Sequence, residues 1–99
     1  MKKFKKVTFI GFGLINSSLA RVFKLKSLAT QVCAYSRRKE TRDKISNLNI
    51  VNLVYDDLVD SVKDSDLIVL GVPVGSMESI VGEISSSLKK GAILTDVGS

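Results

Sequence analysis

The stretch Gly11-Phe12-Gly13-Leu14-Ile15-Asn16 decides the fold, because it joins two segments of different periodicity. Before it, the β-branched and aromatic run Val7–Ile10 predicts a buried strand. After it, the period changes to that of a helix, with apolar residues at Ile15, Leu19, Val22 and Phe23. A glycine-rich turn from a strand into a helix is typical of the start of a βαβ unit.

The alternation of short apolar runs and longer amphipathic segments continues to the end of the chain. Further strands are predicted at Gln31–Tyr35, Leu53–Tyr55, Leu67–Val72 and Ala92–Val97. One helix is predicted at Arg37–Asn47, and a second is predicted to begin after a cap at Asp56 or Asp57. A third helix is predicted along the apolar stripe Met77, Ile80, Val81, Ile84 and Leu88. Lys89 and Lys90 suit its C-terminus, and Gly91 suits the position that ends it.

Each crossover is long enough for a right-handed parallel connection. The sequence therefore predicts an α/β fold with a doubly wound parallel sheet of the Rossmann type, in the order 3-2-1-4-5. We expect residues 1–99 to form one nucleotide-binding domain. A full fold of this type carries a sixth strand, so we also expect a fragment truncated before that strand.

The glycine stretch fits the G-x-G-x-x-G pattern of a diphosphate-binding loop, except at its last position. Gly11 permits the tight turn, and Gly13 lets the backbone approach a pyrophosphate. The free N–H groups and positive dipole end of the helix at Leu14 and Ile15 then face the anion. Asn16 replaces the third glycine. Either the helix stands farther from the sheet, or the Asn16 amide turns toward the phosphates.

The expected ribose end of the cofactor site reads Ser36-Arg37-Arg38, without a carboxylate. A carboxylate there holds the ribose hydroxyls of NAD and would repel a 2′-phosphate, whereas Ser and Arg bind it. The sequence therefore favours NADP over NAD. In the alternative interpretation, Arg37 stacks on the adenine of NAD and Arg38 is solvated. At the other end of the site, we expect the nicotinamide ribose to pass Val72 and Pro73, although a plain strand-to-helix turn explains these two residues equally well.

Composition excludes several other classes of protein. The chain has 99 residues, 44% hydrophobic and 25% charged, with a net charge of +5, one cysteine and no histidine. A Cys/His metal site and a disulfide framework within the chain are excluded. A solvated basic tail is suggested by Lys2, Lys3, Lys5 and Lys6, and a buried strand thiol is suggested by Cys33.

The basic start of the chain and the short apolar run after it resemble a secretory signal peptide, but the helical pattern continues through the supposed cleavage point. No apolar run is long enough to span a bilayer, and we expect a cytoplasmic protein.

Three motifs together resemble the prephenate/arogenate dehydrogenase family of tyrosine biosynthesis, over the whole chain. They are Gly11-Phe12-Gly13-Leu14-Ile15 with Ser17-Ser18-Leu19-Ala20, Asp66-Leu67-Ile68-Val69-Leu70 with Val72-Pro73-Val74, and Thr95-Asp96-Val97-Gly98-Ser99. The last of these separates the chain best from other dehydrogenases with a similar glycine loop.

The resemblance implies oxidative decarboxylation of prephenate or arogenate, with hydride transfer to NAD(P)+. Ser99 matches a family serine that contacts the substrate or the catalytic histidine. That histidine, the substrate-binding arginines and the helical dimerisation domain would lie beyond Ser99, so the resemblance implies a homodimer at full length and little activity in this chain alone. Asn16, and Ser36 in place of the usual Asp, depart from the family pattern.

Three other interpretations remain open from the sequence. A pyrroline-carboxylate or imine reductase has a similar glycine loop, but the Thr95–Ser99 segment argues against it. A non-enzymatic nucleotide-sensing regulatory domain usually keeps the acidic ribose residue that Ser36 replaces. Nucleic-acid binding suits the positive charge, but the basic residues are scattered and no aromatic stacking platform is present.

Overall fold

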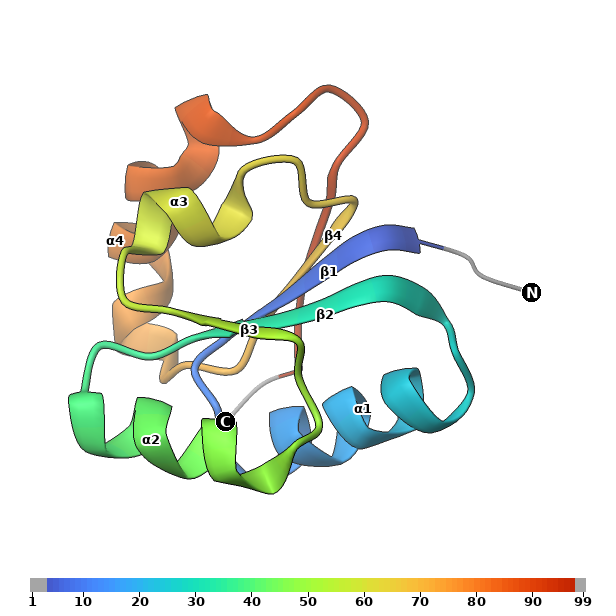
Figure 1. The fold of residues 1–99 in the computed structure, drawn as a ribbon. Helices are drawn as coiled ribbons and strands as arrows, with labels where there is room; N and C mark the ends of the chain where they lie inside the picture. Colours follow the sequence, from blue (N-terminus) through green and yellow to red (C-terminus); the bar gives the residue numbers. More distant parts are fainter. Residues whose placement is uncertain (1–3, 98–99) are drawn as a thin grey trace.

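The computed structural model describes residues 4–97, whose five strands form one parallel sheet (Figure 1). The order is β3-β2-β1-β4-β5, which confirms the predicted topology. The strands are β1 (Phe4–Ile10), β2 (Ala29–Tyr35), β3 (Leu53–Tyr55), β4 (Leu67–Leu70) and β5 (Ile93–Asp96). Every neighbouring pair is parallel, so all five carboxyl ends lie at one edge, called here the carboxyl edge of the sheet.

The helices cover both faces of this sheet. They are α1 (Leu14–Leu25), α2 (Lys39–Leu48), α3 (Leu58–Val62) and α4 (Val74–Ile84), with the 3₁₀ turn η1 (Ser85–Ser87) after α4. Figure 1 shows α1 and α2 on one face and α3 and α4 on the other. The chain winds outward from β1 to β3 on one side and then returns to β4 on the other. The direction of winding therefore changes between β1 and β4, the place where such sheets bind ligands.

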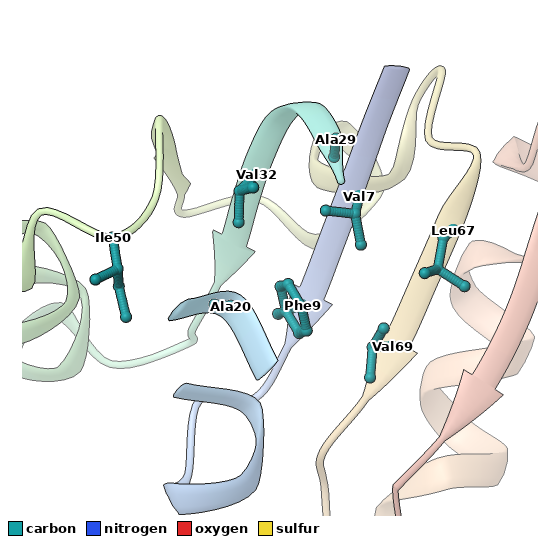
Figure 2. Close-up of a cluster of buried hydrophobic side chains, with 8 residues drawn as sticks. All are labelled: Val7, Phe9, Ala20, Ala29, Val32, Ile50, Leu67 and Val69. Carbon is teal, nitrogen blue, oxygen red and sulfur yellow. The ribbon is translucent and has the colours of Figure 1, made fainter. Parts of the chain in front are cut away.

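Alternation along β1 divides the core between the two faces. Val7 and Phe9 face α1 and belong to the cluster in Figure 2, which also contains Ala20, Ala29, Val32, Ile50, Leu67 and Val69. Ile10 belongs to the cluster beneath α3 and α4. Thr8 is also fully buried, and its hydroxyl bonds the Ser61 carbonyl at 2.8 Å and the Ser65 hydroxyl at 2.7 Å. These bonds satisfy the polar groups that this face of β1 buries.

The buried face of α1 agrees with the predicted stripe only at Leu19 and Phe23, which are partly buried against the core. Asn16 and Ala20 are buried there, whereas Ile15 and Val22 are exposed. The apolar pattern is wider than the face that touches the sheet, so periodicity alone could not locate the centre of that face. Asp57 caps α3, as one of the two alternatives predicted, by accepting a hydrogen bond from the Asp60 N–H at 2.9 Å.

The fourth helix is shorter than predicted, because it ends at Ile84 and not near Leu88. Serine side chains compete for backbone hydrogen bonds, and the run Ser85–Ser87 forms a 3₁₀ turn in place of another α-helical turn. Lys89 therefore does not lie at the end of a helix but pairs with Asp66. Gly91 has a φ of +85° and serves the turn into β5.

The prediction of a basic tail is wrong for Lys5 and Lys6. Lys2 and Lys3 lie outside the described residues, but Lys5 and Lys6 belong to β1. Lys6 is only 8% exposed. Its ammonium donates to the Lys63 carbonyl at 2.8 Å and to the Tyr55 hydroxyl at 3.2 Å, and it lies 4.8 Å from the centroid of the Tyr55 ring. Lys6 thus ties β1 to β3 and to the turn before β4.

Candidate functional site

A cleft of about 550 Å³ opens at the carboxyl edge of the sheet. This volume lies within the range of small-molecule sites. Register brings its parts together, because Ile10 pairs with Tyr35 on one side and with Leu70 on the other. Six residues predicted to bind the cofactor line the cleft: Gly11, Ser36, Arg37, Arg38, Val72 and Pro73. The sheet thus gathers three segments that are far apart in the sequence.

Gly11 is held where no other residue fits. Its φ is +79°, and a Cβ there would lie 2.7 Å from the Gly71 carbonyl oxygen and 2.8 Å from Cγ1 of Val72. Its N–H donates to the Tyr35 carbonyl at 3.1 Å. Gly13 differs, because a Cβ there would meet no atom within 4 Å. The fold therefore requires the first glycine, and the second leaves open space in front of the helix.

The N-terminus of α1 is open to an anion. Gly13 is the N-cap, no side chain caps the helix, and its first turn carries no acidic residue. The first hydrogen bond of the helix runs from the Ser17 N–H to the Gly13 carbonyl at 3.0 Å, so the amides between them have no partner within the helix. Leu14 is 84% exposed and Ile15 51% exposed. Both residues therefore lie at an accessible end of the helix, although neither is among the residues that line the cleft.

The side chain of Asn16 points into the protein and not into the cleft. It is 1% exposed, and its Nδ2 donates to the Gly11 carbonyl at 2.6 Å and to the Ile10 carbonyl at 3.4 Å. Its Oδ1 has no hydrogen-bond partner among residues 4–97. The expectation that this amide turns toward the phosphates is therefore not met. The amide supports the loop from behind.

The segment Ser36–Arg38, which the sequence predicts to bind the ribose, forms another wall of the cleft. Arg37 and Arg38 are exposed, and Ser36 is partly exposed. Arg42 of α2 holds this segment, because its Nη1 donates to the carbonyls of Ser36 at 2.9 Å and Arg37 at 3.0 Å. Arg42 was not among the predicted site residues, although its place one helical turn after Arg38 was a usable signal.

One face of α4 forms a third wall, which was also missed. Ser76, Ser79 and Glu83 line the cleft beside Ile80. Their spacing of three, four and seven residues places them on one side of a helix, and this polar periodicity was a usable signal beside the apolar stripe. Pro73 is the N-cap of α4, which, like α1, has no side-chain cap and no acidic residue in its first turn.

Two titratable groups with shifted pKa values lie outside the lining of the cleft. Asp66 lies at the amino end of β4, opposite the cleft, and the bond from Lys89 lowers the pKa of its carboxyl group, as do the Lys5 and Lys6 amides. Burial raises the pKa of the Cys33 thiol, an effect that the charge of Lys6 partly opposes.

Within residues 4–97, no cluster of His, Cys, Asp and Glu could hold a metal ion. No helix in this range is long and apolar enough to cross a membrane. Ser99 lies outside the described residues.

Comparisons with known proteins identify relatives of this chain. The family described as "Prephenate dehydrogenase, nucleotide-binding domain" matches residues 19–99. A cyclohexadienyl dehydrogenase of Zymomonas mobilis is 38% identical over the whole chain, which covers 34% of that protein. The chain thus spans about a third of the length of this curated relative.

Solved structures share the fold. Synechocystis arogenate dehydrogenase is 26% identical, with a TM-score of 0.82 over 95% of this chain and 33% of that one. Prephenate dehydrogenase of Aquifex aeolicus, in complex with hydroxyphenyl propionate and NAD+, has a TM-score of 0.85 over 96% of this chain and 34% of that one. At 23% identity, the second likeness supports the fold alone.

Proposed function

Because the chain belongs to the family of prephenate dehydrogenase nucleotide-binding domains, we propose that its cleft binds a nicotinamide dinucleotide, and NADP in preference to NAD. The observation that carries this proposal is the composition of one cleft. Gly11, beside the uncapped N-terminus of α1, and the exposed pair Arg37 and Arg38 border the same space. The helix end suits a diphosphate, and the arginines suit a second, separate phosphate.

The preference for NADP rests on the ribose segment. Neither Ser36 nor the two arginines can repel a 2′-phosphate, and the Arg42 bonds hold their backbone in place. A charge-assisted hydrogen bond contributes roughly 1.5–3 kcal/mol. One such bond to the 2′-phosphate would therefore favour NADP by about tenfold or more.

For the whole protein we propose the oxidative decarboxylation of prephenate or arogenate in tyrosine biosynthesis. A nicotinamide bound in the cleft would supply the acceptor for the hydride that leaves the ring carbon bearing the hydroxyl group. As the hydroxyl proton passes to a base, that carbon becomes a carbonyl. The ring carboxylate then leaves as carbon dioxide, its bonding electrons make the ring aromatic, and the phenolate oxygen takes up a proton to give the phenol. Since the chain contains no histidine, a histidine base must come from outside these residues.

This wider proposal places residues 1–99 in the cofactor-binding part of a cytoplasmic, homodimeric enzyme. The relatives named as cyclohexadienyl, prephenate and arogenate dehydrogenases support it. Ser99 remains the residue that we propose for contact with the substrate or the histidine. Family membership argues against the reductase, regulatory and nucleic-acid-binding alternatives.

Calorimetric titration of the chain with NADP+ and NAD+ tests the proposal. We expect tighter binding of NADP+, and a selective loss of about tenfold for NADP+ in Arg37→Ala. Arg21→Ala is the matched control, since it removes an exposed arginine of α1 that does not line the cleft. Equal affinity for both dinucleotides would refute the preference for NADP. No binding of either would refute the proposed function of the chain.

A further inference from the structure

Asn16 departs from the fingerprint at the position where a third glycine normally lets the helix approach the strand. The structure nevertheless keeps α1 close to the sheet, because Asn16 is buried with Ala20 on its inner face. Space for the amide comes from another part of the chain. A Cβ at Gly71 would lie 2.4 Å from Asn16 Nδ2 and 2.7 Å from its Cγ.

The three atoms nearest to that Cβ all belong to Asn16. Gly71 also has no left-handed φ that would itself require glycine. Asn16 is therefore the obstacle to a side chain at Gly71, so the small residue that makes room for the Asn16 amide stands at the end of β4.

The amide uses this space to hold the glycine loop. Nδ2 of Asn16 donates to the Gly11 carbonyl at 2.6 Å. The C=O and N–H of a trans peptide point in opposite directions. Fixing the Gly11 carbonyl toward Asn16 therefore turns the next amide, that of Phe12, away from Asn16. Gly11 lines the cleft, and in the proposed site this amide faces the expected diphosphate.

The arrangement carries a local penalty, which indicates a function beyond packing. Oδ1 of Asn16 is buried and has no hydrogen-bond partner among the described residues. Buried acceptors without a partner are rare because they lose their hydration. An apolar side chain or a glycine would avoid this loss, but neither could donate to the Gly11 carbonyl.

We propose that Asn16 is a positioning residue for the diphosphate loop, and that it can act only because position 71 is glycine. This inference rests on the proposed binding of a dinucleotide and deepens it. Asn16 does not touch the ligand. It orients the Gly11–Phe12 peptide, whose N–H does.

The coupling of the two positions is measured by thermal unfolding without ligand. We expect Gly71→Ala to lower the Tm by roughly 10 °C in the wild-type background. In an Asn16→Gly background the same substitution should change the Tm by less than about 2 °C. Gly75→Ala is the matched control, because a Cβ there meets no atom within 4 Å. Equal losses from Gly71→Ala in both backgrounds would overturn the coupling.

The positioning role is measured by ligand affinity in Asn16→Ala, compared for NADP+ and adenosine 2′-monophosphate. The monophosphate has no diphosphate and reaches only the Ser36–Arg38 end of the cleft. We expect about tenfold weaker binding of NADP+ and unchanged binding of the monophosphate. A purely structural role would weaken both ligands equally or neither, and either result would overturn the proposal. If wild type binds no dinucleotide, the proposed function fails, and the unfolding cycle still decides whether Asn16 and Gly71 are coupled.

Discussion

Two substitutions in the glycine loop should separate what the fold requires from what the ligand requires. In Gly11→Ala, the new Cβ lies 2.7 Å from the Gly71 carbonyl oxygen and 2.8 Å from Val72, at a φ of +79°. The left-handed backbone costs about 1–2 kcal/mol, and overpacking adds about 1–3 kcal/mol. We therefore expect a loss of roughly 2–5 kcal/mol in the free energy of unfolding, a large part of the ~5–15 kcal/mol typical of a domain.

Gly13→Ala should behave in the opposite way. Its Cβ meets no atom within 4 Å and its φ is −87°, so we expect the free energy of unfolding to stay within about 1 kcal/mol of wild type. The added methyl group instead stands where a diphosphate must approach the backbone, and NADP+ binding should fall by about a hundredfold.

Urea unfolding and calorimetric titration with NADP+ measure the two effects separately. The reasoning would be refuted if Gly11→Ala unfolded at the wild-type urea concentration, because the close approach to Gly71 and Val72 would then carry no cost. An NADP+ affinity equal to that of wild type in Gly13→Ala would also refute the reasoning, because the ligand would then not occupy the space before α1.

Three further predictions concern groups outside the cleft. Gly82→Ala should stabilise the chain by up to about 1 kcal/mol in urea unfolding, because a Cβ at this helical position meets no atom within 4 Å; a loss of stability would contradict the packing of α4. The Asp66 carboxyl has a pKa lowered from 3.8, chiefly by Lys89. Its contribution to stability is therefore present above the unfolded value and lost as pH falls through the lower folded value. Asp66→Asn should flatten the pH dependence of the Tm in that acid range, and an unchanged slope would remove the role of the pair. Cys33 is buried with a raised thiol pKa, so a thiol reagent should label it only as fast as the chain unfolds, and rapid labelling in native buffer would contradict its burial.

The sequence predicted the topology because each strand carries its own signal. The apolar runs that became β1 and β4 are buried centrally in the sheet, and the glycine stretch marks the turn into α1. Sequence order and the handedness of crossovers then left few arrangements of the sheet. Its carboxyl edge gathered six of the predicted cofactor residues in one cleft for the same reason.

The sequence could not show the direction of polar side chains, because this direction depends on contacts between different helices and strands. The direction of the Asn16 amide is set by the Gly11 carbonyl and by the empty position at Gly71, more than fifty residues away in the sequence. Likewise, Lys6 looks like part of a basic tail until Tyr55 and the Lys63 carbonyl are placed beside it. A charged residue in a sequence reveals its polarity but not its partners.

The central claim is that a dinucleotide lies along the carboxyl edge, from the N-terminus of α1 to the Ser36–Arg38 segment. Amide chemical shifts of the isotope-labelled chain, followed during titration with NADP+, test it most directly. The account predicts the largest shifts at Gly11–Ile15, at Ser36–Arg38 and at Val72, with Asp66 at the opposite edge unchanged. Shifts confined to that opposite edge, or spread over the basic residues without preference for the cleft, would contradict it.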